Sequence, residues 1–182
     1  MKYYKLNINS LSDEEYKEIY NKADEIRKKK CDNYKLIDDK KRCLAAYYLL
    51  LKVLEEYSID KSKISYDKEH IILIDSDYNI SISHSGYFVL LAISKNKIGI
   101  DIERIRDINF AITGYFCNDN DLDYIDNDIN KFFEVWTFKE AFSKANGMGI
   151  SRESKNINFK DYNKEFVYFD NYIVCLYEKT QD

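Results

Sequence analysis

The sequence predicts an α+β fold built from two similar α+β lobes with a cleft between them. Helix-spaced and strand-like segments both occur along the chain. Their order, strand, helix, helix and then strands, occurs over residues 2–94 and again over 98–178, and a long apolar helix takes the same place in both halves. We therefore expect a first lobe over residues 1–96 and a second over 97–182, together forming one domain.

The first half opens with a strand predicted over residues 2–8, which have strand-like composition. Ser12, with Glu15 three positions later, forms a capping-box pattern, and apolar residues at helical spacing predict a helix over 12–30. A broad apolar face predicts a second helix over 38–57. Short strands bounded by polar turns are predicted over 71–74, 79–83 and 87–94.

The second half opens with a strand predicted over 98–105. Residues 109–128 are weakly helical, and a clear helix is predicted over 129–146, ended by Gly147 and Gly149. Strands are predicted in the tail over 157–159, 165–169 and 172–178.

Composition excludes several classes of protein. The 28 basic and 32 acidic residues give a net charge of −4, which argues against a general nucleic-acid binder. The longest apolar run, residues 43–51, is far shorter than the ~20 residues that span a bilayer, and no secretory signal opens the chain, so we expect no membrane association. The 4 cysteines lack disulfide or zinc spacing, which favours free thiols and a cytoplasmic protein.

The segment IGIDIE contains two carboxylates on one face of the predicted strand, Asp101 and Glu103. Two adjacent carboxylates repel each other unless a cation lies between them. Mg²⁺, bound by carboxylate, phosphate and water oxygens, fits that position. The alternative is an ordinary solvated strand face.

The segment WTFKEAFSK places Trp136, Glu140 and Lys144 on one helix face, four residues apart. Glu140 could be a third metal carboxylate, and Lys144 could reach a phosphate as a point charge. A surface ion pair between helix neighbours is the alternative.

The segment SISHSG contains Ser83 and His84 at the end of a predicted strand. Both could bind a phosphate, although a lone histidine is also compatible with a structural role. No G-x-S-x-G motif accompanies them, which argues against a serine hydrolase. The basic residues around the end of the first helix suit a ligand with several phosphates, or form a solvated helix end: Arg27, Lys28, Lys29, Lys30 and Arg42.

In combination, HSG, IGIDIE and W-x-x-K-E-A-x-x-K followed by G-x-G resemble the 4′-phosphopantetheinyl transferase superfamily. Length and the repeated order of elements resemble its surfactin-type (Sfp-type) branch. The resemblance implies a transferase that moves the phosphopantetheine group of coenzyme A to a serine of an apo acyl- or peptidyl-carrier protein. It also implies dependence on Mg²⁺, with Mn²⁺ as a possible substitute, and the repeated lobes favour a monomer.

The resemblance assigns roles to ten residues. Asp101, Glu103 and Glu140 would hold Mg²⁺, with Glu140 also deprotonating the acceptor serine. Lys144 would stabilise the leaving phosphate. The contacts to coenzyme A would come from Arg27, Lys30, Arg42, Lys68, Ser83, His84 and Lys144. Family members often have Tyr-Gly-Lys-Pro where this chain has Tyr66-Asp67-Lys68-Glu69.

The carrier protein is expected to dock on residues 107–125, which follow the carboxylate strand. Apolar contacts would come from Phe110, Ile112, Tyr115 and Phe116, unless these residues pack the core. Two other functions remain open. One is a coenzyme A- or carrier-binding protein without catalysis, and the other is a Mg²⁺-dependent phosphohydrolase that needs no carrier.

Overall fold

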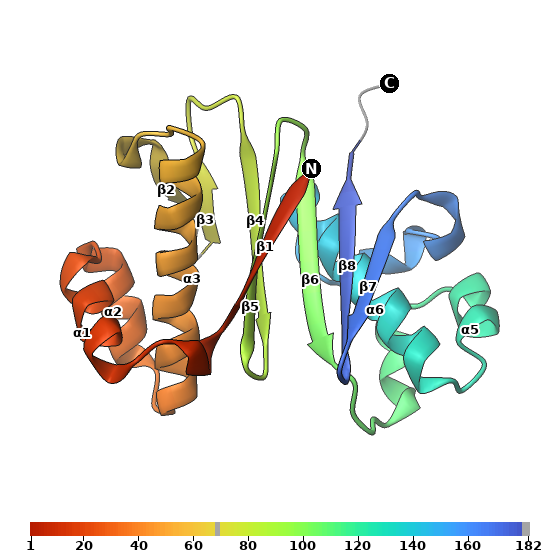
Figure 1. The fold of residues 1–182 in the computed structure, drawn as a ribbon. Coiled ribbons are helices and arrows are strands. Elements are labelled where there is room, and N and C mark those ends of the chain that lie inside the picture. The colour runs from red at the N-terminus through yellow and green to blue at the C-terminus, as the bar shows by residue number, and fades with distance from the viewer. Residues whose placement is uncertain (68–69, 180–182) are drawn as a thin grey trace.

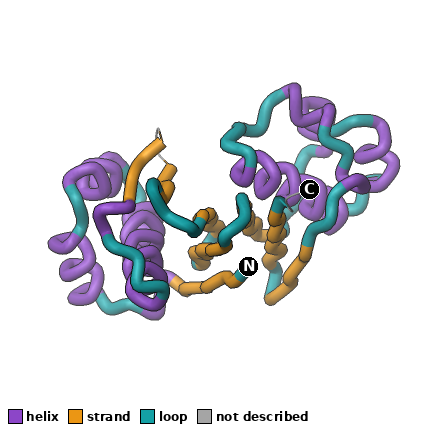
Figure 2. Tube along the Cα trace, turned by 90° about the horizontal axis from the view of Figure 1, so that it is seen from above, coloured by secondary structure: helices purple, strands orange, loops and turns teal. Residues whose placement is uncertain are grey.

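Strands occupy the middle of the molecule and helices lie at both outer sides (Figures 1 and 2). This computed structural model describes residues 1–67 and 70–179. The helices are α1 (Asp13–Lys22), α2 (Glu25–Asn33), α3 (Ile37–Glu56), α4 (Thr113–Phe116), α5 (Asp119–Ile125) and α6 (Ile129–Ala145). The strands are β1 (Lys2–Asn7), β2 (Ile64–Asp67), β3 (His70–Leu73), β4 (Asn79–Ser85), β5 (Phe88–Ser94), β6 (Ile98–Arg104), β7 (Glu165–Phe169) and β8 (Tyr172–Glu178). The mixed α+β class predicted from the sequence is confirmed.

The N-terminal sheet has the order β1-β5-β4, with both pairs antiparallel. Because side chains alternate along a strand, Val89, Leu91 and Ile93 of β5 face one way and join the core under α3. Leu90 and Ala92 face the other way. Strand β5 is therefore buried on both faces, which explains its continuous apolar run.

The C-terminal sheet has the order β6-β8-β7, also antiparallel. One face packs on α6, in a cluster that contains Phe138 and Ile173. The other face packs against β5, where Ile100 and Ile102 meet Leu90. The two sheets thus share a central apolar layer, and β4 lies beside β6.

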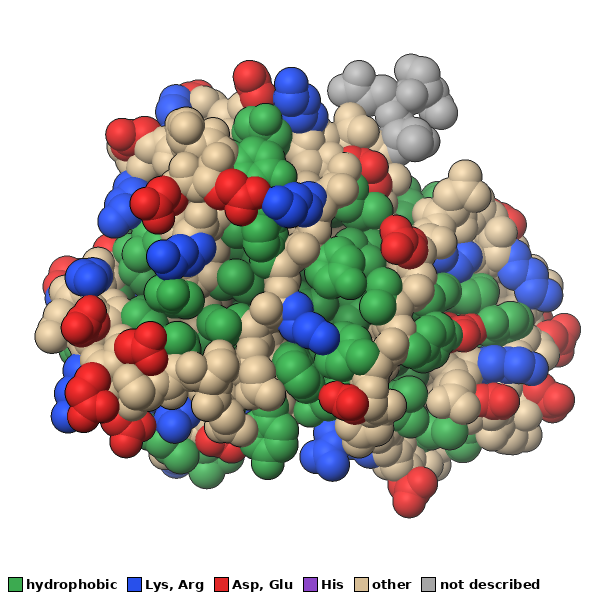
Figure 3. All heavy atoms as spheres, viewed as in Figure 1, with side chains coloured by type: hydrophobic (Ala, Val, Ile, Leu, Met, Phe, Trp, Pro, Cys, Tyr) green, Lys and Arg blue, Asp and Glu red, His purple; other side chains and the backbone are tan. Residues whose placement is uncertain are grey.

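Hydrophobic side chains run along the middle of the face seen in Figure 3, with charged side chains among them and more around the margin. Within the described residues, no helix is long and apolar enough to cross a membrane.

Two predicted elements are wrong. The helix expected over 12–30 is two helices, because Ala23 is extended and the Asp24 side chain accepts from Arg27 N, capping α2 as a separate helix. No strand forms over 157–159. Residues 157–158 connect two short 3₁₀ helices, Arg152–Asn156 and Phe159–Asp161, and residue 159 begins the second of them.

One further prediction needs refinement, and one strand was not predicted. The weakly helical stretch 109–128 consists of a 3₁₀ turn, α4 and α5. Strand β2 was missed, and it pairs with β3 in a separate hairpin. The other predicted elements occur with ends shifted by a few residues.

Candidate active site

Strand β6 carries the predicted carboxylates Asp101 and Glu103. Asp101 is 5% exposed. Its Oδ1 accepts hydrogen bonds from Ser83 Oγ and Lys144 Nζ, both at 2.7 Å. Its Oδ2 is buried and has no hydrogen-bond partner among the residues described. A buried carboxylate oxygen without a donor is costly, so this atom is suited to accept a cation.

Helix α6 brings Glu140 and Lys144, which the four-residue spacing places on one helix face, to β6. The helix packs so closely that a Cβ at Gly99 would lie 1.7 Å from Ala141 O, and this approach therefore requires glycine. Lys144 Nζ reaches both Asp101 Oδ1 and, at 3.2 Å, Ile100 O. The lysine thereby bridges helix and strand at the carboxylates.

Glu140 has a raised carboxyl pKa of about 7. Burial is the largest cause, followed by the negative charge of Asp101; Lys144 opposes the shift and Glu103 adds to it. Because the charges of Asp101, Glu103 and Lys144 all act on Glu140, the four groups share one electrostatic environment. A carboxyl group with this pKa can accept a proton near neutral pH.

Glu103 is held by three donors. Trp136 Nε1 donates to Oε1 at 3.4 Å, while Ser85 Oγ and an Arg106 guanidinium nitrogen each donate to Oε2 at 3.1 Å. In this arrangement Arg106 partly neutralises Glu103, just as Lys144 partly neutralises Asp101.

The carboxylates fit a hard divalent cation by their donor chemistry but do not form a preassembled cage. Within the described part of the chain, no group of three or more His, Cys, Asp or Glu side chains is arranged to hold a metal ion. Mg²⁺ commonly uses one or two carboxylates and completes its shell with substrate phosphates and water. The unpartnered Asp101 Oδ2 is compatible with that mode of binding.

Positive charges gather beside these carboxylates, around His84. Desolvation lowers the pKa of His84, and the nearby charges of Arg42, Lys144 and Lys30 lower it further, although the ring remains accessible to solvent. Arg42 is held in place because it forms an ion pair with Asp39 and donates to Gly86 O at 2.7 Å. This arrangement favours an anionic ligand with more than one phosphate.

Arg27 is a buried cation in helix α2, 4% exposed. Its Nη1 donates to Cys43 Sγ at 3.4 Å, and its Nε has no partner among the described residues. The rings of Tyr47 and Tyr66 each lie 6.0 Å from its guanidinium carbon. Arg27 and Lys30 line one pocket of about 430 Å³ with Tyr66, whose hydroxyl donates to Asp24. Lys68 lies outside the described residues.

A second pocket, of about 240 Å³, is lined by residues from both halves of the chain. It is lined by Asp67, Ile71 and Ile72 of the β2–β3 hairpin, Ile80, Ser81 and Ile82 of β4, and Lys144, Gly147, Met148 and Gly149 at the end of α6. The glycine-rich end of α6 therefore lies at this pocket, with Lys144 between it and the carboxylates.

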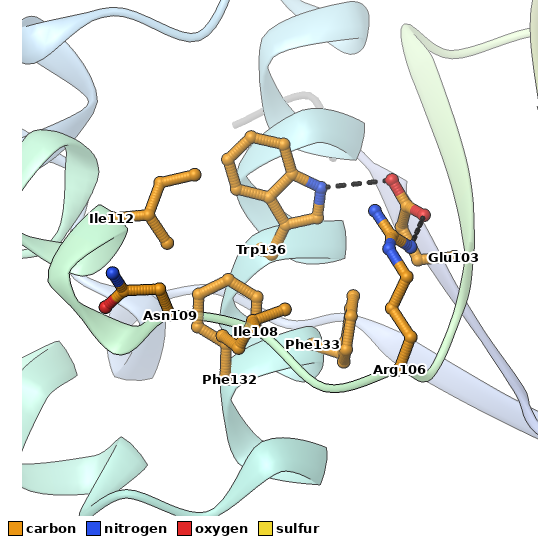
Figure 4. Close-up of a pocket in the computed structure, with 8 residues that line it drawn as sticks. All are labelled: Glu103, Arg106, Ile108, Asn109, Ile112, Phe132, Phe133 and Trp136. Atoms are coloured by element: carbon orange, nitrogen blue, oxygen red, sulfur yellow. Dashed lines mark hydrogen bonds and ion pairs between the residues drawn. The ribbon is translucent and has the colours of Figure 1, made fainter.

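A third pocket, of about 320 Å³, includes Glu103 in its lining (Figure 4). Trp136, Phe132 and Phe133 come from α6, and the segment after β6 contributes Arg106, Ile108, Asn109 and Ile112. Of the four apolar residues considered for docking, Ile112 and Tyr115 are each 49% exposed, whereas Phe116 is fully buried in the core and Phe110 packs partly against it. Phe116 therefore packs the core, whereas Ile112 and Tyr115 remain exposed.

Three residues near this region were missed in the sequence. Ser85 and Arg106 bind Glu103; the Ser85 contact depends on β4 lying beside β6, whereas Arg106 is only three residues from Glu103 in the chain. Lys139, the first lysine of the WTFKEAFSK segment, is fully buried and donates to Asp121 Oδ2 and to the carbonyls of Phe116 and Ser154. It faces away from the carboxylates and has a structural role.

A model of the 4′-phosphopantetheinyl transferase superfamily matches residues 97–177, the segment that contains Asp101, Glu103, Glu140 and Lys144. Over this segment the chain is similar to that superfamily. The resemblance noted in the sequence is confirmed, and several curated 4′-phosphopantetheinyl transferases support the surfactin-type branch.

Three of these transferases illustrate the extent of the similarity. The chain is 34% identical to 4′-phosphopantetheinyl transferase gsp of Aneurinibacillus migulanus over 125 residues, which is 64% of this chain and 53% of that protein. It is 29% identical to 4′-phosphopantetheinyl transferase Sfp of Bacillus subtilis over 153 residues, 78% of this chain and 67% of the relative. For psf-1 of Bacillus pumilus the identity is 29% over 130 residues, with 66% and 56% covered. The chain therefore spans between about half and two thirds of these transferases.

Proposed function

We propose that this phosphopantetheinyl transferase homologue transfers the 4′-phosphopantetheine group of coenzyme A to a serine of an apo acyl- or peptidyl-carrier protein. The supporting observation is the meeting of Asp101, Glu140 and Lys144 beside the cations around His84. Acid, base and cation groups from β6 and α6 are thus brought to one place, where a pyrophosphate could bind.

In the proposed reaction, the serine oxygen forms a bond to the β-phosphorus of coenzyme A as the bond from that phosphorus to the bridging oxygen breaks. Adenosine 3′,5′-bisphosphate leaves, with the electron pair on its phosphate oxygen. Glu140 takes the serine proton as general base. Lys144 stabilises the negative charge that develops on the leaving phosphate.

Asp101, Glu103 and Glu140 would hold Mg²⁺, or Mn²⁺ in its place. When bound, the ion supplies Lewis-acid stabilisation of the pyrophosphate oxygens. Asp101 has the most suitable atom, its unpartnered Oδ2. Glu103 would exchange its contact with Arg106, which lies at an exposed position, for a contact with the ion.

The phosphates of coenzyme A would bind His84, Arg42, Lys30 and Arg27. Arg27 supports this assignment because a buried guanidinium with an unpartnered nitrogen gains most from an anion. Lys68 would lie near the adenine, as the resemblance implies.

The carrier protein would dock at the pocket of Figure 4, on the segment that begins at residue 107. Exposed Ile112 and Tyr115 would supply apolar contacts there. Arg106 would offer a positive charge to an acidic carrier, although the chain as a whole is acidic.

We also propose that residues 1–96 and 97–182 are two lobes of one pseudo-dimeric domain, with the active site between them. In support, each half has a three-stranded antiparallel sheet and one long helix, α3 or α6, on its outer face. The enzyme would act as a monomer in the cytoplasm, where its four free cysteines would stay reduced.

Intact-protein mass spectrometry tests the proposed function. Apo carrier protein, coenzyme A, Mg²⁺ and this protein are incubated, and the carrier is expected to gain the mass of one phosphopantetheine. Excess EDTA should prevent the gain. Coenzyme A binding without any mass gain, across acyl- and peptidyl-carriers, would instead support a binding protein without catalysis.

A further inference from the structure

Three serines of β4 connect it to β6, although the two strands belong to different sheets. Ser81, Ser83 and Ser85 alternate along β4 and therefore point to one side. Their hydroxyl oxygens accept hydrogen bonds from backbone N–H groups of β6, at Ile100 (3.0 Å), Ile102 (3.4 Å) and Arg104 (3.1 Å). The separation of 19 residues is the same in all three pairs, so the strands run parallel. We call these three residues the serine seam.

Two of these serines also donate their hydroxyl proton, each to the side chain of the β6 residue that precedes the N–H group it accepts from. Ser83 donates to Asp101 Oδ1 at 2.7 Å, and Ser85 donates to Glu103 Oε2 at 3.1 Å. At the first position the corresponding residue is Gly99, which has no side chain to receive the proton of Ser81. Ser81 therefore forms the same contact with the β6 backbone but makes no contact with a carboxylate.

Each seam hydroxyl has one proton, and this limits what Ser83 can do. Ser83 is buried, with 7% of its surface exposed, and its hydroxyl proton is directed to Asp101. A direct hydrogen bond from Ser83 to a phosphate of coenzyme A would have to break that contact. The geometry favours an action of Ser83 through Asp101 over the phosphate contact that the sequence resemblance implies.

We propose that Ser83 and Ser85 are positioning residues, which hold the two carboxylates of β6 in the orientation that binds the divalent cation. This inference rests on the proposed function. With Oδ1 of Asp101 bound by Ser83 and Lys144, its buried Oδ2 is left for the cation. Since the same hydroxyls join the two sheets, the packing of β4 against β6 and the orientation of the carboxylates depend on each other.

The seam also supplies its own control for an experiment. Ser83→Ala removes a bond to the β6 backbone and a bond to a carboxylate, whereas Ser81→Ala removes only a bond to the backbone. The affinity for Mn²⁺ is measured by electron paramagnetic resonance with saturating coenzyme A and no carrier protein, so the readout does not depend on turnover. The unfolding midpoint of each variant is measured in parallel.

We expect both alanine variants to unfold at similar, slightly lower temperatures. Ser83→Ala should weaken Mn²⁺ binding by about 10-fold or more, which is the usual effect of losing a partner of a metal ligand, while Ser81→Ala should stay near the wild-type value. Ser83→Thr keeps a hydroxyl and should recover most of the affinity. If Ser83→Ala fails to fold, the same comparison is made with the partly buried Ser85→Ala, with the same expectation.

Equal Mn²⁺ affinity in the tested variant and Ser81→Ala would overturn the positioning role. The wild-type protein is assayed for phosphopantetheine transfer in the same series. Transfer by the wild type together with equal affinities would refute the seam inference alone, whereas absence of both transfer and Mn²⁺ binding in the wild type would refute the proposed function.

Discussion

Lys139 Nζ lies 2.5 Å from Asp121 Oδ2, and neither side chain has any exposed surface. The ammonium group also donates to two carbonyl oxygens, and Asp121 accepts from the backbone N–H groups of Asn118 and Phe159. The pair therefore ties α6 to the α4–α5 segment and to the 3₁₀ helices that follow α6. Five residues further along the helix, Lys144 is bound to Asp101 in the candidate site.

Substitution by methionine should mainly lower stability at Lys139 and mainly lower the transfer rate at Lys144. Lys139→Met leaves Asp121 charged and buried without its cation, so the free energy of unfolding should fall by about 3–5 kcal/mol. Lys144→Met removes a partly exposed cation and one of the two side-chain donors of Asp101, so the loss of stability should be smaller than for Lys139→Met, while the transfer rate should fall at least 100-fold. Denaturant unfolding and transfer assays on both variants check the contrast, and a stable Lys139→Met protein would contradict the structural role.

Glu140→Gln should make the metal-free protein more stable at pH 8. The folded state raises the pKa of Glu140 from 4.5 to about 7. The carboxyl group therefore holds its proton more tightly when folded, and its favourable contribution is complete below pH 4.5 and lost as the pH rises through 7. At pH 8 the glutamine should gain roughly 2 kcal/mol, after allowance for partial exposure, and lose transfer activity.

Thermal unfolding in EDTA at pH 5 and pH 8 measures this effect. The difference between variant and wild type should be larger at pH 8. A difference that shrinks from pH 5 to pH 8 would show that the carboxyl pKa is not raised.

Gly99→Ala should separate α6 from β6. A Cβ would lie 1.7 Å from Ala141 O, so helix or strand must move, at a cost of about 3 kcal/mol. That movement would also pull Lys144 from Asp101 and reduce transfer. Gly114→Ala is the matched control, since nothing lies within 4 Å of its Cβ position and its stability should be unchanged or slightly higher. Equal unfolding temperatures for the two variants would rule out the tight contact.

Ile112→Asp should impair use of the carrier protein. The side chain is 49% exposed at the pocket of Figure 4, so the variant should fold normally. We expect the KM for the carrier to rise about 10-fold, as for loss of a buried apolar contact, with the KM for coenzyme A unchanged. Ile74→Asp, at another exposed apolar position (43%), should leave both constants as they are. A changed KM for coenzyme A alone would place the docking surface elsewhere.

The site was more predictable from sequence than the connections around it. Asp101 and Glu103 alternate on a strand, and Glu140 and Lys144 are four apart on a helix, so local periodicity was enough to group each pair. The meeting of the two pairs depends on the packing at Gly99, which no local pattern shows.

Other features depended on contacts between distant segments. Ser85 contacts Glu103 only because β4 lies parallel to β6. The break at Ala23 and Asp24 was hidden because apolar residues continue at helical spacing across it, while the Asp24 cap is a weak signal among many acidic residues.

The most direct test of the proposed function is the mass of an apo carrier protein after incubation with coenzyme A, Mg²⁺ and either the wild-type protein or Asp101→Ala. Circular dichroism first establishes that the variant is folded. We expect a gain of one phosphopantetheine with the wild type and no gain with the folded variant. Normal transfer by folded Asp101→Ala would contradict the assignment of this site.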